Sequence, residues 1–150
     1  TYPFTSQLAY QRKMASWGSK EVVAPGSGFY LSTRIKPDGT PACMFLGSGP
    51  ALKYAERPGG WSVETVYNDF AQSPDMTLDS QGRAVFTYQV LEAPYQTYLR
   101  RREGPGAYSA PVDLKLGQIS FNFHSTLASA NDGIWIANLF AVVCNKILST

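Results

Sequence analysis

The fold is decided by residues 52–88, LKYAERPGGWSVETVYNDFAQSPDMTLDSQGRAVFTY. Two short segments of strand-like composition flank the turn RPGG at 57–60, and two more flank DSQG at 79–82. Glycine can take the positive φ that tight hairpins need, and the carboxylate of Asp79 can accept hydrogen bonds from N–H groups of its turn. The stretch therefore predicts two β-hairpins joined by a loop at 67–74.

Parts of this stretch recur elsewhere in the chain. The segment LKY at 52–54, followed by Trp61, matches LAY at 8–10, followed by Trp17, and both features are 44 residues apart. A weaker third copy, YLR at 98–100, continues the series. Two features that recur at one spacing indicate a chain built from similar pieces of supersecondary structure.

A second feature recurs out of phase with the first. IKPDG at 35–39 matches LDSQG at 78–82 after 43 residues, and ANDG at 130–133 repeats the pattern after about 51. Two interleaved features at a common period of roughly 44 residues, with four short strands in each unit, are typical of β-propeller blades. The sequence therefore predicts an all-β fold of the propeller type.

The composition agrees with this fold class. Only 16% of the 150 residues are charged and 13% are aromatic, and the chain has 13 glycines and 10 prolines. Few charges, many aromatics and frequent turn formers favour strands over helices. A net charge of +2 gives no strong attraction to nucleic acid. No apolar run reaches the length of about 18 residues that a membrane span needs, so we expect neither nucleic acid nor membrane as a partner.

The predicted strands divide this single domain into a half blade, two whole blades and another half blade, at 1–24, 25–68, 69–116 and 117–150. That makes about three blades per chain, whereas closed propellers typically have about four to eight. We expect a second copy of the chain to complete the ring head to tail, which would leave no exposed strand edges. Two alternatives remain open. The chain belongs to a larger propeller or is completed by a different chain, or the fold is a β-fold of another kind.

Residues 52–66 and 78–88 resemble repeats of bacterial β-propeller proteins. In those repeats a strand ends in an Asp-Ser-x-Gly turn, and a Leu-Lys-Tyr-Ala strand and a Gly-Gly-Trp hairpin follow. The resemblance implies the fold but no particular function, since such repeats occur in sugar binders, adhesins and proteins without a known role. The chain is also somewhat similar to the Asp-box repeats of sialidases. However, none of Asp38, Asp79 and Asp132 stands in the full Ser-x-Asp-x-Gly-x-Thr-Trp pattern, so no sialidase active-site residue is inferred.

No motif of the sequence predicts catalysis. His124 is the only histidine, so a Ser–His–Asp set, a Cys–His pair or a zinc site could be built only around it. Asp69 and Asp75 share a loop and are interpreted as solvated acids rather than as paired catalytic carboxylates. Cys43 and Cys144 are interpreted as buried free thiols, although a bridge between them stays open. The sequence therefore predicts a protein that is not an enzyme and needs no metal or cofactor.

Three aromatic residues hold the same place in successive units, at the start of the strand that follows the hairpin. They are Trp17, Trp61 and Tyr108. Together with Arg57 and Glu64, such rings could stack on a sugar while the polar groups hold its hydroxyls. The other interpretation of the three rings is packing between successive blades.

The predicted function is a non-catalytic, carbohydrate-binding module of the lectin type, in which repeated weak sites gain from avidity. The alternative is a structural or assembly protein without a small-molecule ligand. It would be a shell or filament subunit, or a propeller half completed by a partner chain. The expected location is extracellular or at the cell surface, with a cytoplasmic location left open.

Two further predictions concern the faces of strands. Arg100 and Arg102 share one face of a strand while Arg101 points away, because side chains alternate along a strand. This run is interpreted as a charged strand face that discourages aggregation. The predicted core contains Leu52, Tyr54, Val63, Val66, Met76, Leu78, Val85, Phe86 and Leu99.

Overall fold

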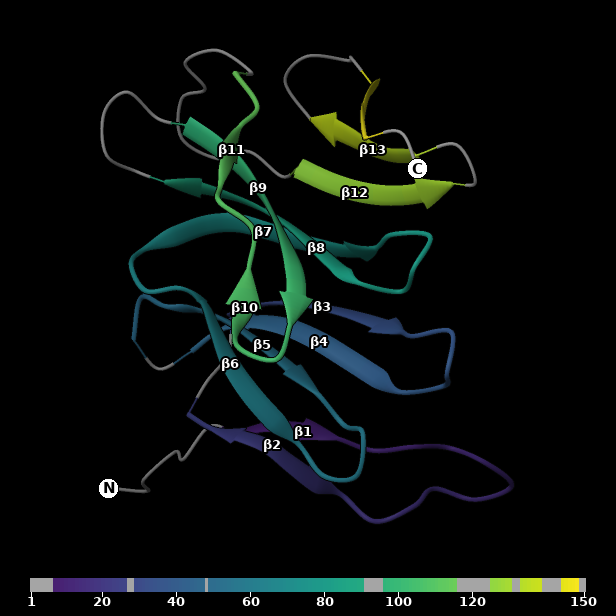
Figure 1. Ribbon diagram of the computed structural model, residues 1–150. Coiled ribbons are helices and arrows are strands. Elements are labelled where there is room, and N and C mark those ends of the chain that lie inside the picture. The colour runs from purple at the N-terminus through teal and green to yellow at the C-terminus, as the bar shows by residue number, and fades with distance from the viewer. Residues whose placement is uncertain are drawn as a thin grey trace.

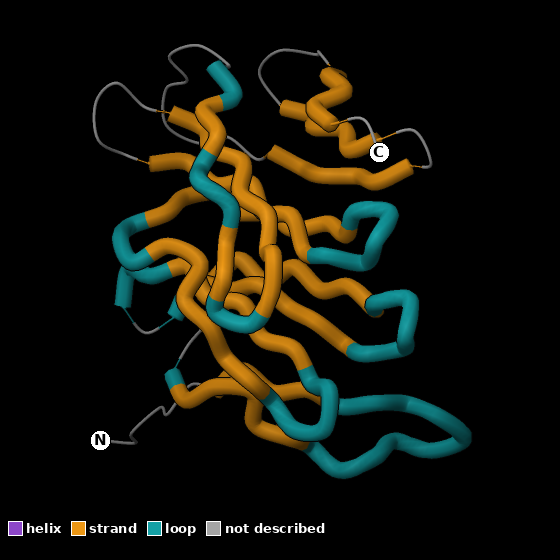
Figure 2. The backbone as a smooth tube through the Cα atoms, viewed as in Figure 1, coloured by secondary structure: helices purple, strands orange, loops and turns teal. Residues whose placement is uncertain are grey.

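The computed structural model describes residues 7–26, 29–47, 49–90, 96–115, 125–130, 133–138 and 144–148. Within these ranges every regular element is a strand and none is a helix, which confirms the all-β class (Figure 2). None of the described segments is therefore an apolar helix of membrane-spanning length. The strands form separate antiparallel sheets that are stacked face to face, and none of these sheets closes on itself (Figure 1).

Each sheet is built from one continuous part of the chain. The first sheet has two strands, β1 (Gln7–Tyr10) and β2 (Glu21–Pro25). The second is a meander of four strands, β3 (Phe29–Ile35), β4 (Pro41–Leu46), β5 (Leu52–Glu56) and β6 (Ser62–Tyr67). The third has five, β7 (Ala71–Leu78), β8 (Ala84–Val90), β9 (Gln96–Gly104), β10 (Ala107–Tyr108) and β11 (Val112–Asp113). The last has three, β12 (Ser125–Ala130), β13 (Gly133–Asn138) and β14 (Cys144–Leu148).

The stretch 52–88 forms the two hairpins that its sequence predicts, but the loop predicted at 67–74 is shorter, because β7 already begins at Ala71. Its four strands are β5, β6, β7 and the greater part of β8. The first two complete the second sheet and the last two begin the third, so the stretch joins one sheet to the next. The assignment of these sheets to propeller units, and the number of units, stays a prediction.

The turn at 79–82 is held as its residues predict. The Oδ1 atom of Asp79 accepts hydrogen bonds from the N–H groups of Gln81 at 3.0 Å and Arg83 at 2.9 Å. Gly82 has a φ of 73°, which an L side chain rarely adopts. A carboxylate acceptor and a glycine with positive φ together fix this hairpin between β7 and β8.

The matching turn of the second sheet lies against this one. The Oδ1 atom of Asp38 accepts a hydrogen bond of 2.8 Å from the N–H of Thr40, and Gly39 has a φ of 83°. Figure 2 shows the two turns one above the other on the same side of the stack. A Cβ atom on Gly82 would lie 2.8 Å from Cδ of Pro37, so the absence of a side chain at Gly82 allows the contact. The third copy of the turn includes Asp132, which lies outside the described residues.

This contact predicts different effects for alanine at two otherwise similar glycines. Gly82→Ala should lower the free energy of unfolding by about 1–3 kcal/mol more than Gly39→Ala. Both changes place a side chain at positive φ, but a Cβ on Gly39 would meet no atom within 4 Å. Urea unfolding of the two variants measures the difference. Equal losses would show that Pro37 moves aside at no cost.

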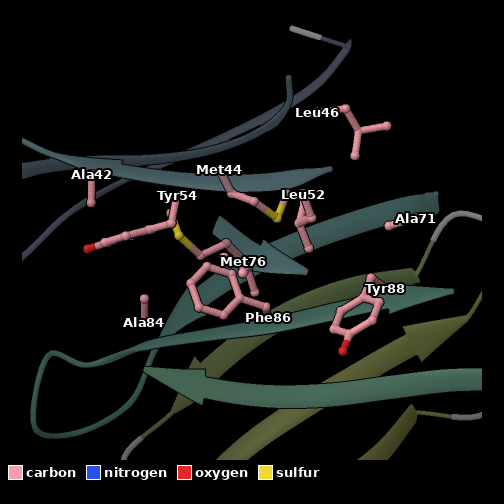
Figure 3. Close-up of a cluster of buried hydrophobic side chains, with 11 residues drawn as sticks. Ala42, Met44, Leu46, Leu52, Tyr54, Ala71, Met76, Ala84, Phe86 and Tyr88 are labelled. Atoms are coloured by element: carbon pink, nitrogen blue, oxygen red, sulfur yellow. The ribbon is translucent and has the colours of Figure 1, made fainter. Parts of the chain in front are cut away.

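The main core lies between the second and third sheets, where side chains of β4 and β5 meet those of β7 and β8 (Figure 3). Its largest fully buried members are Tyr54, Tyr88, Phe86, Met44 and Leu52. A smaller core, which includes Val23, Cys43 and Phe45, lies between the first and second sheets. Because alternate residues of β4 enter opposite cores, nearly the whole strand is apolar and buried.

The predicted core is largely confirmed. Seven of its members are buried, namely Leu52, Tyr54, Val66, Met76, Val85, Phe86 and Leu99. Leu78 is partly buried and packs against the main core. Val63 is 44% exposed, so its prediction was wrong. It lies on the face of β6 that points away from Glu64 and Val66, and the inward positions of that strand are taken by those two residues.

The second, third and fourth sheets touch most extensively along their first strands. β7 packs against β3 on one side and against β12 on the other. Ser32 on β3 donates a hydrogen bond of 2.8 Å to Oδ1 of Asp75 on β7. The guanidinium of Arg34 lies 3.9 Å from the same oxygen. These polar contacts fasten β3 to β7 beside the apolar core.

Candidate functional site

The second and third sheets are joined by a buried group of charges, which we call the ion network. At its centre is Arg102 on β9, whose guanidinium donates to both carboxylate oxygens of Glu64, at 2.7 and 3.1 Å. The same guanidinium lies 2.9 Å from Oε1 of Glu56, the last residue of β5. The three side chains are only 11%, 12% and 10% exposed, in that order. One cation thus bridges two carboxylates that belong to the neighbouring sheet.

Two tyrosines and a lysine complete the ion network. The hydroxyl of Tyr108 donates to Glu64 at 2.7 Å, and that of Tyr54 donates to Glu56 at 3.0 Å. Lys36 Nζ also donates to Glu56, at 3.1 Å. The Arg102 guanidinium lies 5.2 Å from the ring centroid of Tyr54, within the range of a cation–π contact.

The pKa values in the ion network follow from burial and from these bonds. Burial alone would raise the pKa of Glu64, but hydrogen bonds from Arg102, Tyr108 and the Gly106 N–H outweigh it and hold this pKa below its usual value. The hydrogen bond to Glu64 raises the pKa of Arg102. Burial, followed by the nearby carboxylates, raises the pKa of Tyr54 and of Tyr108. The guanidinium and Glu64 therefore stay charged and the phenols stay protonated at neutral pH, as in a structural link rather than an acid–base site.

Two of the predicted site residues, Glu64 and Tyr108, come together in the ion network. The Tyr108 ring also lies near Phe86, at a centroid distance of 6.1 Å, and the Arg100 guanidinium lies 5.3 Å from the same ring. Trp61 lies elsewhere, with its ring edge-on to Tyr10 at a centroid distance of 5.3 Å. These two rings therefore pack in different surroundings.

Trp17 and Arg57 lie in further, separate places. Because β1 ends at Tyr10 and β2 begins at Glu21, Trp17 lies in the loop between them, and its expected position at the start of a strand was wrong. Its side chain is 60% exposed, and the ammonium of Lys13 is 5.6 Å from its ring centroid. Arg57 pairs with Glu21 at 2.6 Å. The structure does not gather Trp17, Trp61 and Tyr108 into equivalent pockets, and their role in sugar binding stays a prediction.

A polar cavity, which we call the turn cavity, lies between the second and third sheets. Its volume is about 260 Å³, and its polar lining includes Lys36, Asp38, Gln81, Arg83, Arg102 and Glu103. The Pro37–Gly82 contact belongs to its wall. The ion network lies beside it, because Tyr54 and Arg102 line the cavity as well.

A second polar cavity, the first-sheet cavity, lies between the first and second sheets. It has a volume of about 610 Å³, and its polar lining includes Tyr10, Arg12, Glu21, Asp38, Thr40 and Arg57. Asp38 thus contributes to both polar cavities. The sequence prediction placed Arg57 in a binding site, and the structure places it at this cavity.

An apolar cavity, the apolar slot, adjoins the first-sheet cavity. It has a volume of about 400 Å³ and is lined mainly by side chains of β1, β2, β3 and β4, with Trp61. The indole Nε1 of Trp61 is buried and has no hydrogen-bond partner among the described residues. A buried N–H without a partner is costly, so this position is one where an additional acceptor would stabilise the protein.

Residues with metal-binding or nucleophilic chemistry form no cluster in the described part of the chain. No group of three candidate metal ligands occurs within the described ranges. Cys43 is a buried free thiol, as predicted, and burial raises its pKa to about 11, which disfavours the reactive thiolate. His124 lies outside the described residues, and nothing is described of the Cys144 side chain.

Sequence reasoning missed the residues that join the sheets. Arg102 was assigned to a charged strand face, whereas it is buried between two carboxylates. Strand alternation could have indicated this ion pair, because Glu64 and Val66 lie on the same face of β6. A carboxylate beside a buried valine is itself largely buried, and a buried charge needs a partner of opposite sign. Asp38 was interpreted only as a turn residue, although it also lines both polar cavities.

Comparison with known proteins adds no assignment to this geometry. A scan against protein-family models and a search of curated proteins both find no match. The resemblance to bacterial propeller repeats and the extracellular location therefore stay predictions.

Proposed function

We propose that this protein is a non-catalytic assembly module of propeller-type sheets, whose open first sheet is completed by strands of a second copy. The observation that carries the proposal is the apolar surface around the apolar slot. Leu31 and Ile35 of β3 line this slot and are 53% and 64% exposed, and Phe29 at the start of the same strand is 68% exposed. Clusters of large exposed apolar side chains mark protein interaction sites more often than ordinary surface.

Unpaired strand edges adjoin this surface. The first sheet has only β1 and β2, and β3 is one of the two edge strands of the second sheet, the other being β6. An isolated pair of strands is marginally stable in water, so added strands would stabilise it. Strand addition supplies backbone hydrogen bonds at the edge, while alternate side chains of the added strand enter apolar pockets. An added strand could also bring an acceptor to Trp61 Nε1.

The order of the sheets favours a head-to-tail contact between copies. In Figure 1 the first sheet and the β12–β14 sheet lie at opposite ends of the stack. A contact between two unlike ends of identical chains closes into a ring if its rotation permits, and otherwise continues as a filament. Both outcomes agree with the assembly function, and the ring corresponds to a propeller shared by two chains.

The oligomeric state tests this proposal. We expect native mass spectrometry and light scattering to show a dimer or a larger assembly of the wild-type chain. The Leu31→Glu variant should be mainly monomeric. Glutamate at this position would place a charge against the incoming apolar strands. Val63→Glu is the matched control, because Val63 is similarly exposed but does not line the apolar slot.

Two outcomes would contradict the proposal. One is a wild-type chain that stays monomeric at every concentration while it remains folded. The other is an assembly that Leu31→Glu and Val63→Glu weaken equally, since this would place the contact away from the apolar slot.

A further inference from the structure

The two polar cavities hold equivalent positions in successive sheets. The first-sheet cavity is lined by Tyr10 and Gly39, and the turn cavity by Tyr54 and Gly82. The tyrosines are 44 residues apart and the glycines 43, which is the period of the sequence repeat. Each cavity therefore lies between one sheet and the next, beside a glycine turn. Because the two cavities recur with the period of the sequence repeat, we interpret them as two versions of one feature of the repeating unit.

The turn cavity presents donors and acceptors side by side. Arg83 and Gln81 can donate, and the carboxylates of Asp38 and Glu103 can accept. Hydrogen bonds from Thr40 hold the pKa of Asp38 below its usual value, so this carboxylate is ionised at neutral pH. A mixture of both kinds of group within one small space matches a ligand that carries several hydroxyls, because each hydroxyl both donates and accepts.

The basic side chains of this cavity are already paired with carboxylates. Arg83 lies 2.8 Å from Asp79 and 3.3 Å from Glu103. Lys36 lies 3.1 Å from Glu56. A strongly charged ligand would have to compete with these pairs, whereas a neutral ligand can use the remaining hydrogen-bonding capacity of the same groups.

The volume limits the size of the ligand. Pockets for drug-sized molecules usually have about 300–1,000 Å³, and the turn cavity has about 260 Å³. This space suits a single sugar unit rather than an oligosaccharide. The first-sheet cavity is larger, at about 610 Å³, because the first sheet consists only of β1 and β2 and supplies no counterpart of the turn at Lys36–Asp38.

We infer that the turn cavity is a binding site for one neutral saccharide unit, with Asp38 and Glu103 accepting bonds from its hydroxyls and Arg83 and Gln81 donating to them. The first-sheet cavity is a wider version of the same site. This assignment is independent of the proposed assembly, because both walls of the turn cavity belong to complete sheets of one chain. It also differs from the predicted aromatic site, since none of Trp17, Trp61 and Tyr108 lines the turn cavity.

The inference is tested by an NMR titration of the ¹⁵N-labelled full chain with methyl glycosides of glucose, galactose, mannose and fucose. Titration to about 10 mM detects a Kd of about 1 mM. We expect at least one glycoside to shift the amide signals of Gly39, Gln81, Gly82 and Gly104. Sodium glucuronate and inorganic phosphate serve as charged probes, and we expect them to shift these signals less.

Asp38→Asn is expected to raise the Kd of the bound glycoside about tenfold, because a hydrogen bond to a charged acceptor is lost. The amide oxygen can still accept from the Thr40 N–H, so the turn is retained. Asp69→Asn is the matched control, since Asp69 is also exposed and also accepts one backbone N–H bond, from Phe70 at 2.7 Å. It should leave the Kd unchanged.

Three results would overturn the inference. They are the absence of shifts at the turn cavity with all four glycosides, stronger binding of glucuronate or phosphate than of any glycoside, and equal effects of Asp38→Asn and Asp69→Asn. None of them depends on the oligomeric state. A loss of the sugar site can therefore be distinguished from a loss of the assembly.

Discussion

Arg102→Met is expected to lower the free energy of unfolding by about 3–5 kcal/mol, because it leaves buried carboxylates without their cation. Methionine retains much of the aliphatic volume of arginine, so the loss reports mainly on charge. Glu64 would lose both of its bonds to the guanidinium, and Glu56 would keep only Lys36 as a cationic partner. Urea unfolding followed by tryptophan fluorescence measures the change.

Arg57→Met is the matched control for this variant. Arg57 also pairs with a glutamate, but both side chains of that pair are more than one third exposed. Water screens such a pair, so its removal should cost far less. Adding Glu64→Gln to Arg102→Met should recover part of the stability, because it removes one uncompensated charge. Similar losses for Arg102→Met and Arg57→Met would show that the ion network does not hold the sheets together.

The pH dependence of stability gives an independent measure of the same group. The pKa of Glu64 is lower in the folded protein than in the unfolded chain, where it is about 4.3. The contribution of Glu64 to the free energy of unfolding is therefore fully present above its pKa in the unfolded chain. This contribution is lost as the pH falls through the pKa of Glu64 in the folded protein. The difference in stability between wild type and Arg102→Met should accordingly shrink as the pH is lowered through this range.

Phe86→Ala is expected to cost about 3–5 kcal/mol of stability, which is typical of a phenylalanine removed from a core. Phe86 is fully buried between the second and third sheets, and its ring meets that of Tyr54 edge-on at a centroid distance of 5.5 Å (Figure 3). The loss combines the transfer free energy of the ring with the cavity that remains. Thermal and urea unfolding both report it.

Phe29→Ala is the control for this second variant. The Phe29 side chain is 68% exposed, so its removal should change the stability of the isolated chain by less than about 0.5 kcal/mol. Because Phe29 belongs to the surface proposed for assembly, it should instead weaken the association of copies. If Phe29→Ala strongly destabilised the monomer, the Phe29 side chain would already be buried by other residues of the same chain.

The sequence predicted those features that depend on neighbouring residues. The hairpin at 79–82 follows from one aspartate and one glycine, and the strand 52–56 follows from a short segment between turns. Alternation along β4 and β8 then predicts two buried faces once the strands are known. These features need no knowledge of which sheets lie next to one another.

The features that the sequence did not predict depend on contacts between sheets. Glu64 and Arg102 are 38 residues apart and meet only because β6 and β9 belong to adjacent sheets. Val63 and Val66 have similar side chains, and only the position of the neighbouring sheet decides which of them is buried. Trp17 and Trp61 hold equivalent positions in the sequence repeat, but their structural surroundings differ, because Trp17 lies in the loop between β1 and β2.

β7 contacts both β3 and β12, so the second, third and fourth sheets approach one another closely along these strands. Units shaped like wedges bend into an arc when they are laid side by side, and each added unit turns the arc by the same angle. The angle between neighbours, rather than the length of one polypeptide, then determines how many units complete a circle. A methyl group on Gly82 would press against Pro37 and so push two turns of neighbouring sheets apart. In the proposed assembly, a substitution there would change the number of sheets that complete a ring.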